Sequence, residues 1–338
     1  MSIDPLRDPD AVQLSRSDRL VGADGRSLRR ARAAGTLTSI RRGVYAEASV
    51  WSELAGRERH LLRMRAVLDT RKGDAVFGFE SAAAIWNLPV IGTWPEAVHV
   101  FTADGRRRSS GGGVIWHNAP LSDGDVAEID GVLVTSRVRT LLDLARRSGF
   151  MSAVATLDRA FAGAVKEEHT THAAGRLRAT LLDRIDALDG APGTARARVA
   201  VQFASHLSGS PGESASRVQI HLCGFPAPVL QYPVVDRYGT LWHADVGWPE
   251  HRLLGEFDGF TKYTRAEYTQ GQSIEEIVWA EKKREDLMRA AGYGMSRWLW
   301  SDALRAPLLT RILLDAGLPR RRSGANSRSS DRNTRRTA

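Results

Sequence analysis

Three carboxylates in one short segment of this 338-residue chain could hold a cation. Asp245 stands in one alternating run, and Glu256 and Asp258 stand in the next run, beyond a polar turn. Two alternating runs around a turn predict an antiparallel hairpin. If the turn centres on Glu250 and His251, Asp245 lies directly opposite Glu256, and Asp258 shares their face of the sheet.

Like charges that face each other across a strand pair repel, so this patch favours a bound positive ion. We therefore predict a metal site whose ligands are Asp245, Glu256 and Asp258. Lys262 follows closely enough in the sequence to assist chemistry at such a site.

The segment around the predicted hairpin indicates which elements position these carboxylates. Ser210 and Glu213 have the spacing of a helix N-terminus, at the N-cap and N3 positions. Glu213 is therefore either a capping residue or a further catalytic carboxylate. The predicted order of helix, three strands, long helix and strand gives a mixed sheet flanked by helices.

The bulk composition describes a soluble globular protein, with 42% hydrophobic and 26% charged residues. No apolar run approaches the roughly 20 residues that span a bilayer, and the first ten residues lack the apolar core of a secretory signal. The single cysteine, Cys223, excludes an internal disulfide framework and a zinc site made of several thiolates. A cytoplasmic protein is expected.

The formal net charge of +9 is concentrated near the C-terminal end. Residues 319–338 hold seven arginines and one aspartate, a charge of +6, which leaves +3 for the rest of the chain. This tail lacks large apolar side chains and is predicted to be disordered. Either it attracts polyanions such as nucleic acid in a salt-sensitive manner, or it is only a solubilising tail.

The first 48 residues are predicted to form a winged helix-turn-helix. Residues 10–22 have helical spacing, residues 25–35 form a short basic helix, and residues 36–45 alternate like a strand pair. In this layout the second helix enters the major groove and the hairpin, or wing, contacts phosphates. The predicted DNA contacts are Ser27, Arg29, Arg30 and Arg32 on the helix and Arg41 and Arg42 on the wing. The alternative is a small helical cap with solvated arginines.

Helical spacing in the middle of the chain predicts helices at 51–72, 77–88 and 135–147, and strand-like runs stand at 97–102, 113–117 and 131–135. This part of the chain shows no constellation of chemically active residues. His99 and His117 stand singly on predicted strands and are expected to be core or surface histidines, the alternative being metal ligands. Asp143 and Asp158 are expected to be acids on helix surfaces.

Together these patterns predict a multidomain α/β protein. Its predicted segments are a winged helix-turn-helix (1–48), an α/β module (49–165), a helical connection (166–209), a mixed sheet flanked by helices (210–302), a C-terminal helix (303–318) and a basic tail (319–338).

Spaced motifs in residues 210–302 are shared with a known superfamily. They are the Glu213-Ser214 pair, the Pro-Ala-Pro of 226–228, Gln231, Asp245, and the segments 256–263, 281–286 and 297–298. On these residues the segment resembles the PD-(D/E)XK nucleases, close to Vsr-like endonuclease domains. The resemblance implies a restriction-endonuclease-like fold.

The first 165 residues contain shorter motifs in a fixed order. They lie at 35–37, 41–45, 80–83, 87–89 and 135–145. On these motifs the segment resembles the AbiEi family of type IV toxin–antitoxin antitoxins.

The nuclease resemblance implies a mechanism. Asp245 and Glu256 would bind Mg²⁺ or Mn²⁺, with Glu213 assisting through water, because these ions prefer oxygen ligands. The metal would activate a water and stabilise charge on the phosphodiester. Lys262 would orient the water or neutralise the phosphate. The superfamily pattern places a lysine two residues after the glutamate, where this chain has Asp258, so a fold retained without hydrolysis is the alternative.

Two functions of different class follow from these observations. The first is a DNA-binding protein with a metal-dependent nuclease-like domain that hydrolyses phosphodiester bonds. The second is a non-catalytic AbiEi-type antitoxin, a transcriptional regulator that binds operator DNA, and a third, weaker interpretation is an RNA-directed factor. The antitoxin resemblance implies a cognate toxin as partner, a two-fold operator favours a homodimer, and no membrane partner is expected.

Overall fold

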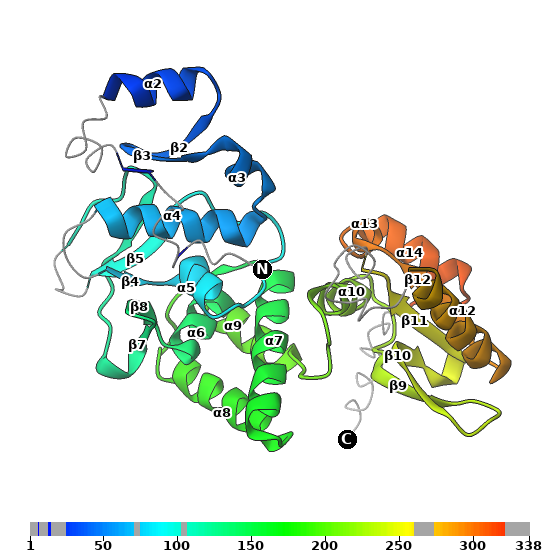
Figure 1. The fold of residues 1–338 in the computed structure, drawn as a ribbon. Coiled ribbons are helices and arrows are strands. Elements are labelled where there is room, and N and C mark those ends of the chain that lie inside the picture. Colours follow the sequence, from blue (N-terminus) through cyan, green and yellow to red (C-terminus); the bar gives the residue numbers. More distant parts are fainter. Residues whose placement is uncertain are drawn as a thin grey trace, which may run out of the picture. The chain divides into compact units, whose positions relative to one another are not determined.

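The computed structural model shows a chain of two compact units, Met1–Pro211 and Gly212–Ala338. Both are mixed α/β (Figure 1). The described residues are 6, 13–14, 25–70, 75–102, 107–259 and 274–321, with the backbone alone at 13–14, 25–26, 274–278 and 280–281. No helix in this part of the chain is long and apolar enough to cross a membrane.

The first unit begins with a small antiparallel sheet and a basic helix. Its elements are β1 (Gln13–Leu14), α2 (Gly25–Ala33), β2 (Leu37–Arg41) and β3 (Val44–Glu47), with the strand order β1-β3-β2. Helix α2 ends where Gly35 adopts a left-handed φ of +76°. Thr36 then donates from its backbone nitrogen and its Oγ1 to the carbonyl of Ala31, at 3.0 and 2.9 Å. These contacts satisfy a free carbonyl at the helix end.

The predicted helix at residues 10–22 falls mostly outside the described residues. The two described positions, Gln13 and Leu14, form strand β1 instead, because they pair with Tyr45 and Val44 of β3. Pairing with a distant strand overrides the helical spacing of this segment.

Helix α4 (Gly56–Thr70) joins the small sheet to the rest of the first unit, after the short helix α3 (Ala48–Glu53). Leu62 and Ala66 of α4 pack against strand β3, whereas Leu61 and Met64 belong to the core of the next sheet. Helix α4 thus contributes side chains to both hydrophobic cores. This explains why the predicted segments 1–48 and 49–165 belong to one compact unit.

A five-stranded mixed sheet follows, with the order β6-β5-β4-β8-β7. Its elements are β4 (Ala75–Phe77), α5 (Phe79–Ile85), β5 (Val98–Thr102), β6 (Val114–His117), a 3₁₀ turn (Asp123–Asp125), β7 (Val126–Ile129) and β8 (Val132–Thr135). The pairs β5–β6 and β4–β8 are parallel, and the others are antiparallel.

Four helices complete the first unit and pack on one another (Figure 1). They are α6 (Arg137–Arg147), α7 (Phe150–Glu168), α8 (His172–Asp186) and α9 (Thr194–Phe203). Leu181, Ile185 and Val201 are fully or almost fully buried. Residues 166–209 therefore contribute to the core of this unit, beyond the connecting role that their composition predicts.

The second unit is a four-stranded mixed sheet with helices on both faces. Its elements are α10 (Pro211–Leu222), β9 (Val229–Val235), β10 (Leu241–Trp248), a 3₁₀ turn (Pro249–His251), β11 (Leu253–Phe257), α12 (Ile274–Ala290), β12 (Gly294–Trp298), α13 (Trp300–Ala303) and α14 (Ala306–Asp315). The strand order is β12-β11-β10-β9, with only β11–β12 parallel.

Two separate apolar clusters cover this sheet. Ile220 of α10 and Leu309 of α14 pack with Trp248, whereas Met288 of α12 packs with Leu254. The predicted order of helix, three strands, helix and strand is confirmed for this unit.

Candidate functional site

The predicted hairpin is formed by β10 and β11. Val246 pairs with Gly255 and Trp248 with Leu253, so the turn centres between Glu250 and His251. One further step along the same register places Asp245 opposite Glu256, as the alternating runs predict. The side chain of Asp245 also reaches the next strand, where its Oδ2 accepts from the backbone nitrogen of Phe257 at 2.8 Å.

The carboxylate of Glu256 is buried and bound by two arginines. Glu256 is 3% exposed. Arg284 of α12 donates from Nη2 to Oε1 and Oε2 at 2.7 and 2.8 Å. Arg297 of β12, its partner in the parallel register, lies 3.3 Å from Oε2. A buried charge is stable only when opposite charge and hydrogen bonds accompany it, and these two guanidinium groups supply both.

Arg297 connects Glu256 to two further acids. It contacts Asp258 Oδ1 through Nη2 at 2.9 Å and Glu285 Oε2 through Nη1 at 2.8 Å. Burial opposes ionisation of Glu285, but the hydrogen bonds and charges of Arg289 and Arg297 outweigh it and lower the pKa of this carboxyl. The cluster is thus an alternating network of acids and arginines.

Glu213 of helix α10 contacts strand β9. Its Oε2 accepts from Nε2 of Gln231 at 3.3 Å. In strand β9, Leu230 pairs with Val246 and Tyr232 with Ala244, so Gln231 stands opposite Asp245. Gln231 has a left-handed φ of +47°, which distorts the strand at this point.

The described arrangement does not fit a magnesium site. Carboxylate oxygens are suitable ligands, but both oxygens of Glu256 and Oδ1 of Asp258 face guanidinium groups. Among the described residues no group of three His, Cys, Asp or Glu side chains is arranged to hold a metal ion. Lys262, the predicted catalytic lysine, lies outside the described residues.

The predicted DNA contacts lie on α2 and the β2–β3 turn, in the upper part of the first unit in Figure 1. Arg29, Arg30, Arg32 and Arg42 are exposed, and none of them forms an ion pair with another described residue. Ser27 is half-buried beside the buried Leu28, which holds the helix against its neighbours.

Arg41 differs from the other predicted contacts. It is half-buried, and burial lowers its pKa. Its Nη1 is buried without a hydrogen-bond partner in the described structure. A guanidinium in this position is less available to a phosphate than the exposed group of Arg42.

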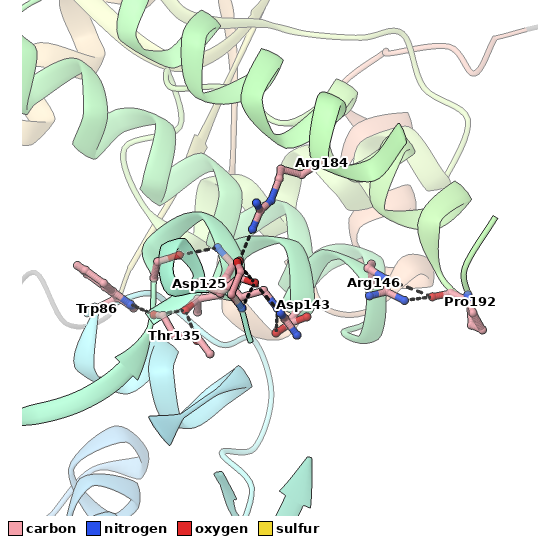
Figure 2. Close-up of polar contacts among 11 residues, drawn as sticks. Trp86, Asp125, Thr135, Asp143, Arg146, Arg184 and Pro192 are labelled. Atoms are coloured by element: carbon pink, nitrogen blue, oxygen red, sulfur yellow. Dashed lines mark hydrogen bonds and ion pairs between the residues drawn. The ribbon is translucent and has the colours of Figure 1, made fainter. Parts of the chain in front are cut away.

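Helix α6 anchors a second polar network, drawn in Figure 2. Arg139 donates from Nε to Asp143 Oδ2 at 2.9 Å and lies 3.3 Å from Asp125 Oδ2. Arg184 of α8 also pairs with Asp125 (Figure 2). These ion pairs tie the start of α6 to the turn before β7 and to α8.

At its C-terminal end, helix α6 contacts the loop before α9. Arg146 donates from Nε and Nη2 to the carbonyl of Pro192 at 3.2 and 2.9 Å (Figure 2). The next residue, Gly193, has a φ of +86°, and a β-carbon there would collide with the carbonyl oxygen of Arg146. A glycine is therefore needed for this close approach.

The histidines in the middle of the chain contact each other. His99 and His117 each stand on a strand, as expected, and the parallel register of β5 and β6 brings His99 Nδ1 within 2.9 Å of His117 Nε2. Burial is the largest cause of a lowered pKa in both rings. The positive charges of His99, Arg147 and Arg139 add to it at His117, whose pKa falls to about 4.

Asp143 and Asp158 are not surface acids, since they are 3% and 1% exposed. Asp143 bonds Arg139, and Asp158 accepts from the backbone nitrogen of Ser205 at 2.7 Å. Burial raises the pKa of Asp143, although the charge of Arg139 opposes this shift. The sequence contains one feature that could have indicated this polar network, namely the four arginines of helix α6.

Comparison with known proteins gives distant similarities. No family model matches the chain. The uncharacterized proteins MT2308 and Rv2248, from the CDC 1551 / Oshkosh and H37Rv strains of Mycobacterium tuberculosis, are each 26% identical to it over 251 residues, or 72% of this chain and 84% of the relative. The crystal structure of the RV2827C protein from the same species is similar with a TM-score of 0.33 and 18% identity, over 59% of this chain and 78% of that one. These similarities place the chain in no functionally defined family.

Proposed function

We propose that the protein binds duplex DNA through helix α2 and the β2–β3 hairpin, as a winged-helix regulator of the AbiEi antitoxin type. The observation that supports this most is the set of exposed arginines on α2 and at the hairpin turn, which have no ion pair among the described residues. Helix α2 itself contains no acidic residue. Its charge is therefore available to a polyanion.

The geometry of α2 suits a helix that enters a groove. Arg29, Arg30 and Arg32 are spread over roughly half of the helix circumference, because each residue advances by about 100°. Leu28, one turn before Arg32, is buried and marks the edge of this arc that packs on the protein. Strand β3 of the neighbouring hairpin packs against helix α4, so the hairpin is fixed on the body of the first unit.

Anisotropy of a short fluorescent duplex tests this proposal. The Arg29→Gln/Arg30→Gln double variant removes two charges from exposed positions and should weaken binding by about tenfold or more at moderate salt, since each phosphate contact adds to affinity. The matched control is Arg159→Gln, an exposed arginine on α7. Equal affinities of the double variant and the control would contradict the proposal.

Phosphodiester hydrolysis by the second unit is the second candidate. The cross-strand placement of Asp245 and Glu256, with Glu213 and Gln231 on neighbouring elements, favours it. The pairing of Glu256 with Arg284 and Arg297 weighs against it, because the guanidinium groups stand where a cation would bind.

Cleavage of plasmid and single-stranded DNA with Mg²⁺ or Mn²⁺ tests this candidate. Glu256→Gln should abolish cleavage, whereas Glu250→Gln, an exposed acid in the turn of the same hairpin, should leave it unchanged. Wild-type protein that cuts neither substrate, or equal cutting by both variants, would remove hydrolysis from consideration.

A further inference from the structure

A cavity of about 440 Å³ lies in the first unit, between the start of α5, strands β5 and β6, one side of helix α6 and the start of α9. We call it the arginine pocket. It is lined by Arg139, Arg146, Arg147 and Arg196, with Phe79, Phe101 and His117 as aromatic walls. The pocket shares no residue with the predicted DNA contacts or with the carboxylate network of the second unit.

The lining of the arginine pocket has an excess of positive charge. Asp143 is the one acid in it, and that acid is already bound by Arg139. Arg146 donates only to a neutral carbonyl, that of Pro192 (Figure 2). Arg147 and Arg196 are exposed and have neither an ion pair nor a hydrogen bond with any described side chain. Their charges are thus available to an anion.

Besides burial, the positive charge of the pocket lowers the pKa of the neighbouring histidines His99 and His117. Burial is the largest cause of the low pKa of His117, but Arg147 and Arg139 lower it further. A neutral His117 adds no positive charge of its own near pH 7, and its ring remains a flat, weakly polar wall. The anion-binding charge of the pocket therefore comes from the arginines at neutral pH.

The aromatic walls form a stacked, pre-arranged surface. The rings of Phe79 and His117 lie 4.2 Å apart between centroids, and Phe79 stacks on Phe101 at 5.8 Å. The guanidinium of Arg147 lies over the ring of Phe79 at 5.0 Å, and that of Arg139 lies over Phe101 at 5.2 Å. These contacts fix the direction of two of the cationic groups.

The backbone at the start of α5 is strained. Phe79 has a φ of +51°, a left-handed conformation that bulky side chains rarely adopt. A β-carbon on the preceding Gly78 would collide with the ring of Phe101. Backbone strain of this kind clusters at binding and catalytic sites, where it holds a side chain in a required position.

We propose that the arginine pocket binds a phosphomonoester on an organic group with a planar ring, the chemistry of a nucleoside monophosphate. Arg147 and Arg196 bind the phosphate, because two guanidinium groups match its charge and its bidentate geometry. The ring lies against a guanidinium plane or against His117, the half-buried ring of the aromatic wall, because Phe79 and Phe101 are 6% and 1% exposed. The volume lies within the range of small-molecule sites.

This ligand has two sources, a free nucleotide or the 5′-phosphorylated end of a nucleic-acid strand. Calorimetry with the full chain separates them by comparing inorganic phosphate, adenosine, adenosine 5′-monophosphate, and one short single strand with and without a 5′-phosphate. Preference for the nucleotide over both phosphate and adenosine identifies the free nucleotide. A preference that depends on the 5′-phosphate of the strand, without measurable binding of the nucleotide, identifies a strand end.

The decisive variant is Arg147→Gln/Arg196→Gln, since both positions are exposed and the change leaves the buried network intact. It should weaken binding of the phosphorylated probe roughly tenfold or more. Arg159→Gln is the control and should bind as the wild type does. Thermal denaturation checks that all three proteins are folded.

Three results would overturn the proposal. In the first, no phosphorylated probe binds to the wild type at millimolar concentration, and in the second, the double variant binds as tightly as the control. In the third, inorganic phosphate binds as tightly as the nucleotide, because the aromatic wall would then contribute nothing. Duplex binding by the Arg29→Gln/Arg30→Gln variant is a separate readout, so failure of the pocket and failure of the proposed DNA contact are distinguishable.

Discussion

At the scale of single residues, the second unit is organised around one buried carboxylate. Glu256 has three guanidinium–carboxylate distances between 2.7 and 3.3 Å, from arginines on two different elements. Such pairing makes ionisation of a buried acid tolerable without a metal. The same residue is therefore either the centre of a structural ion network or a ligand that must exchange its partners before it can hold a cation.

Removal of Arg284 should be strongly destabilising. Arg284→Ala removes the contacts of 2.7 and 2.8 Å to the buried Glu256 carboxylate and leaves the longer one to Arg297, and loss of one partner from a buried pair costs about 3 kcal/mol of the free energy of unfolding. Arg289→Ala, which breaks a more exposed pair with Glu285 on the same helix, should cost less than about 1 kcal/mol. Urea unfolding of the full chain, followed by tryptophan fluorescence, measures both. A similar loss in the two variants would show that Glu256 does not depend on Arg284.

The pairing of Asp245 with Glu256 was predictable, but their arginine partners were not. A hairpin fixes its register through a local turn, so the two carboxylates could be aligned from sequence alone. Arg284 lies 28 residues beyond Glu256 on a helix, and its side chain direction depends on how that helix packs. The same reason hides the contact of His99 with His117, which needs the parallel register of β5 and β6.

At the scale of elements, short strands are harder to predict than helices. The spacing predicts a helix from Phe77, whereas Ala75, Val76 and Phe77 form the buried strand β4 and the helix starts at Phe79. A continuous apolar run of this length does not distinguish a buried strand from a helix. Strand β7 was missed altogether, because its four residues show no clear alternation. Helix α6 was predicted within two residues, since its leucines repeat at helical spacing.

Two glycines in helical neighbourhoods should respond in opposite ways to alanine. Gly193→Ala should destabilise by about 1–3 kcal/mol, because the φ of +86° is unfavourable for alanine and the added carbon collides with the Arg146 carbonyl. Gly175→Ala lies inside helix α8, where no atom would meet the new carbon, and should stabilise by about 0.5–1 kcal/mol. Thermal and urea denaturation of both variants measures the difference. If Gly193→Ala left the free energy of unfolding unchanged, the loop before α9 would not pack closely against α6 in solution.

At the scale of the whole molecule, both proposed arginine-based binding sites, helix α2 and the arginine pocket, lie in the first unit, whereas the carboxylate network around Glu256 lies in the second. Composition shows the excess of arginine but not where it gathers, because Arg196 and the arginines of α6 become neighbours only when α9 packs on α6. The sequence therefore predicts the basic helix α2, a local feature, but not the arginine pocket.

The salt dependence of duplex binding tests the central claim most directly. Each arginine that neutralises a phosphate contributes about 0.9 to the slope of log affinity against log salt. The account predicts that Arg29→Gln/Arg30→Gln weakens binding and reduces the magnitude of this negative slope by about two units relative to wild type. Arg159→Gln should leave the slope unchanged. A slope that is equal in all three proteins, or a wild type that does not bind duplex DNA even at low salt, would contradict the assignment of DNA binding to helix α2.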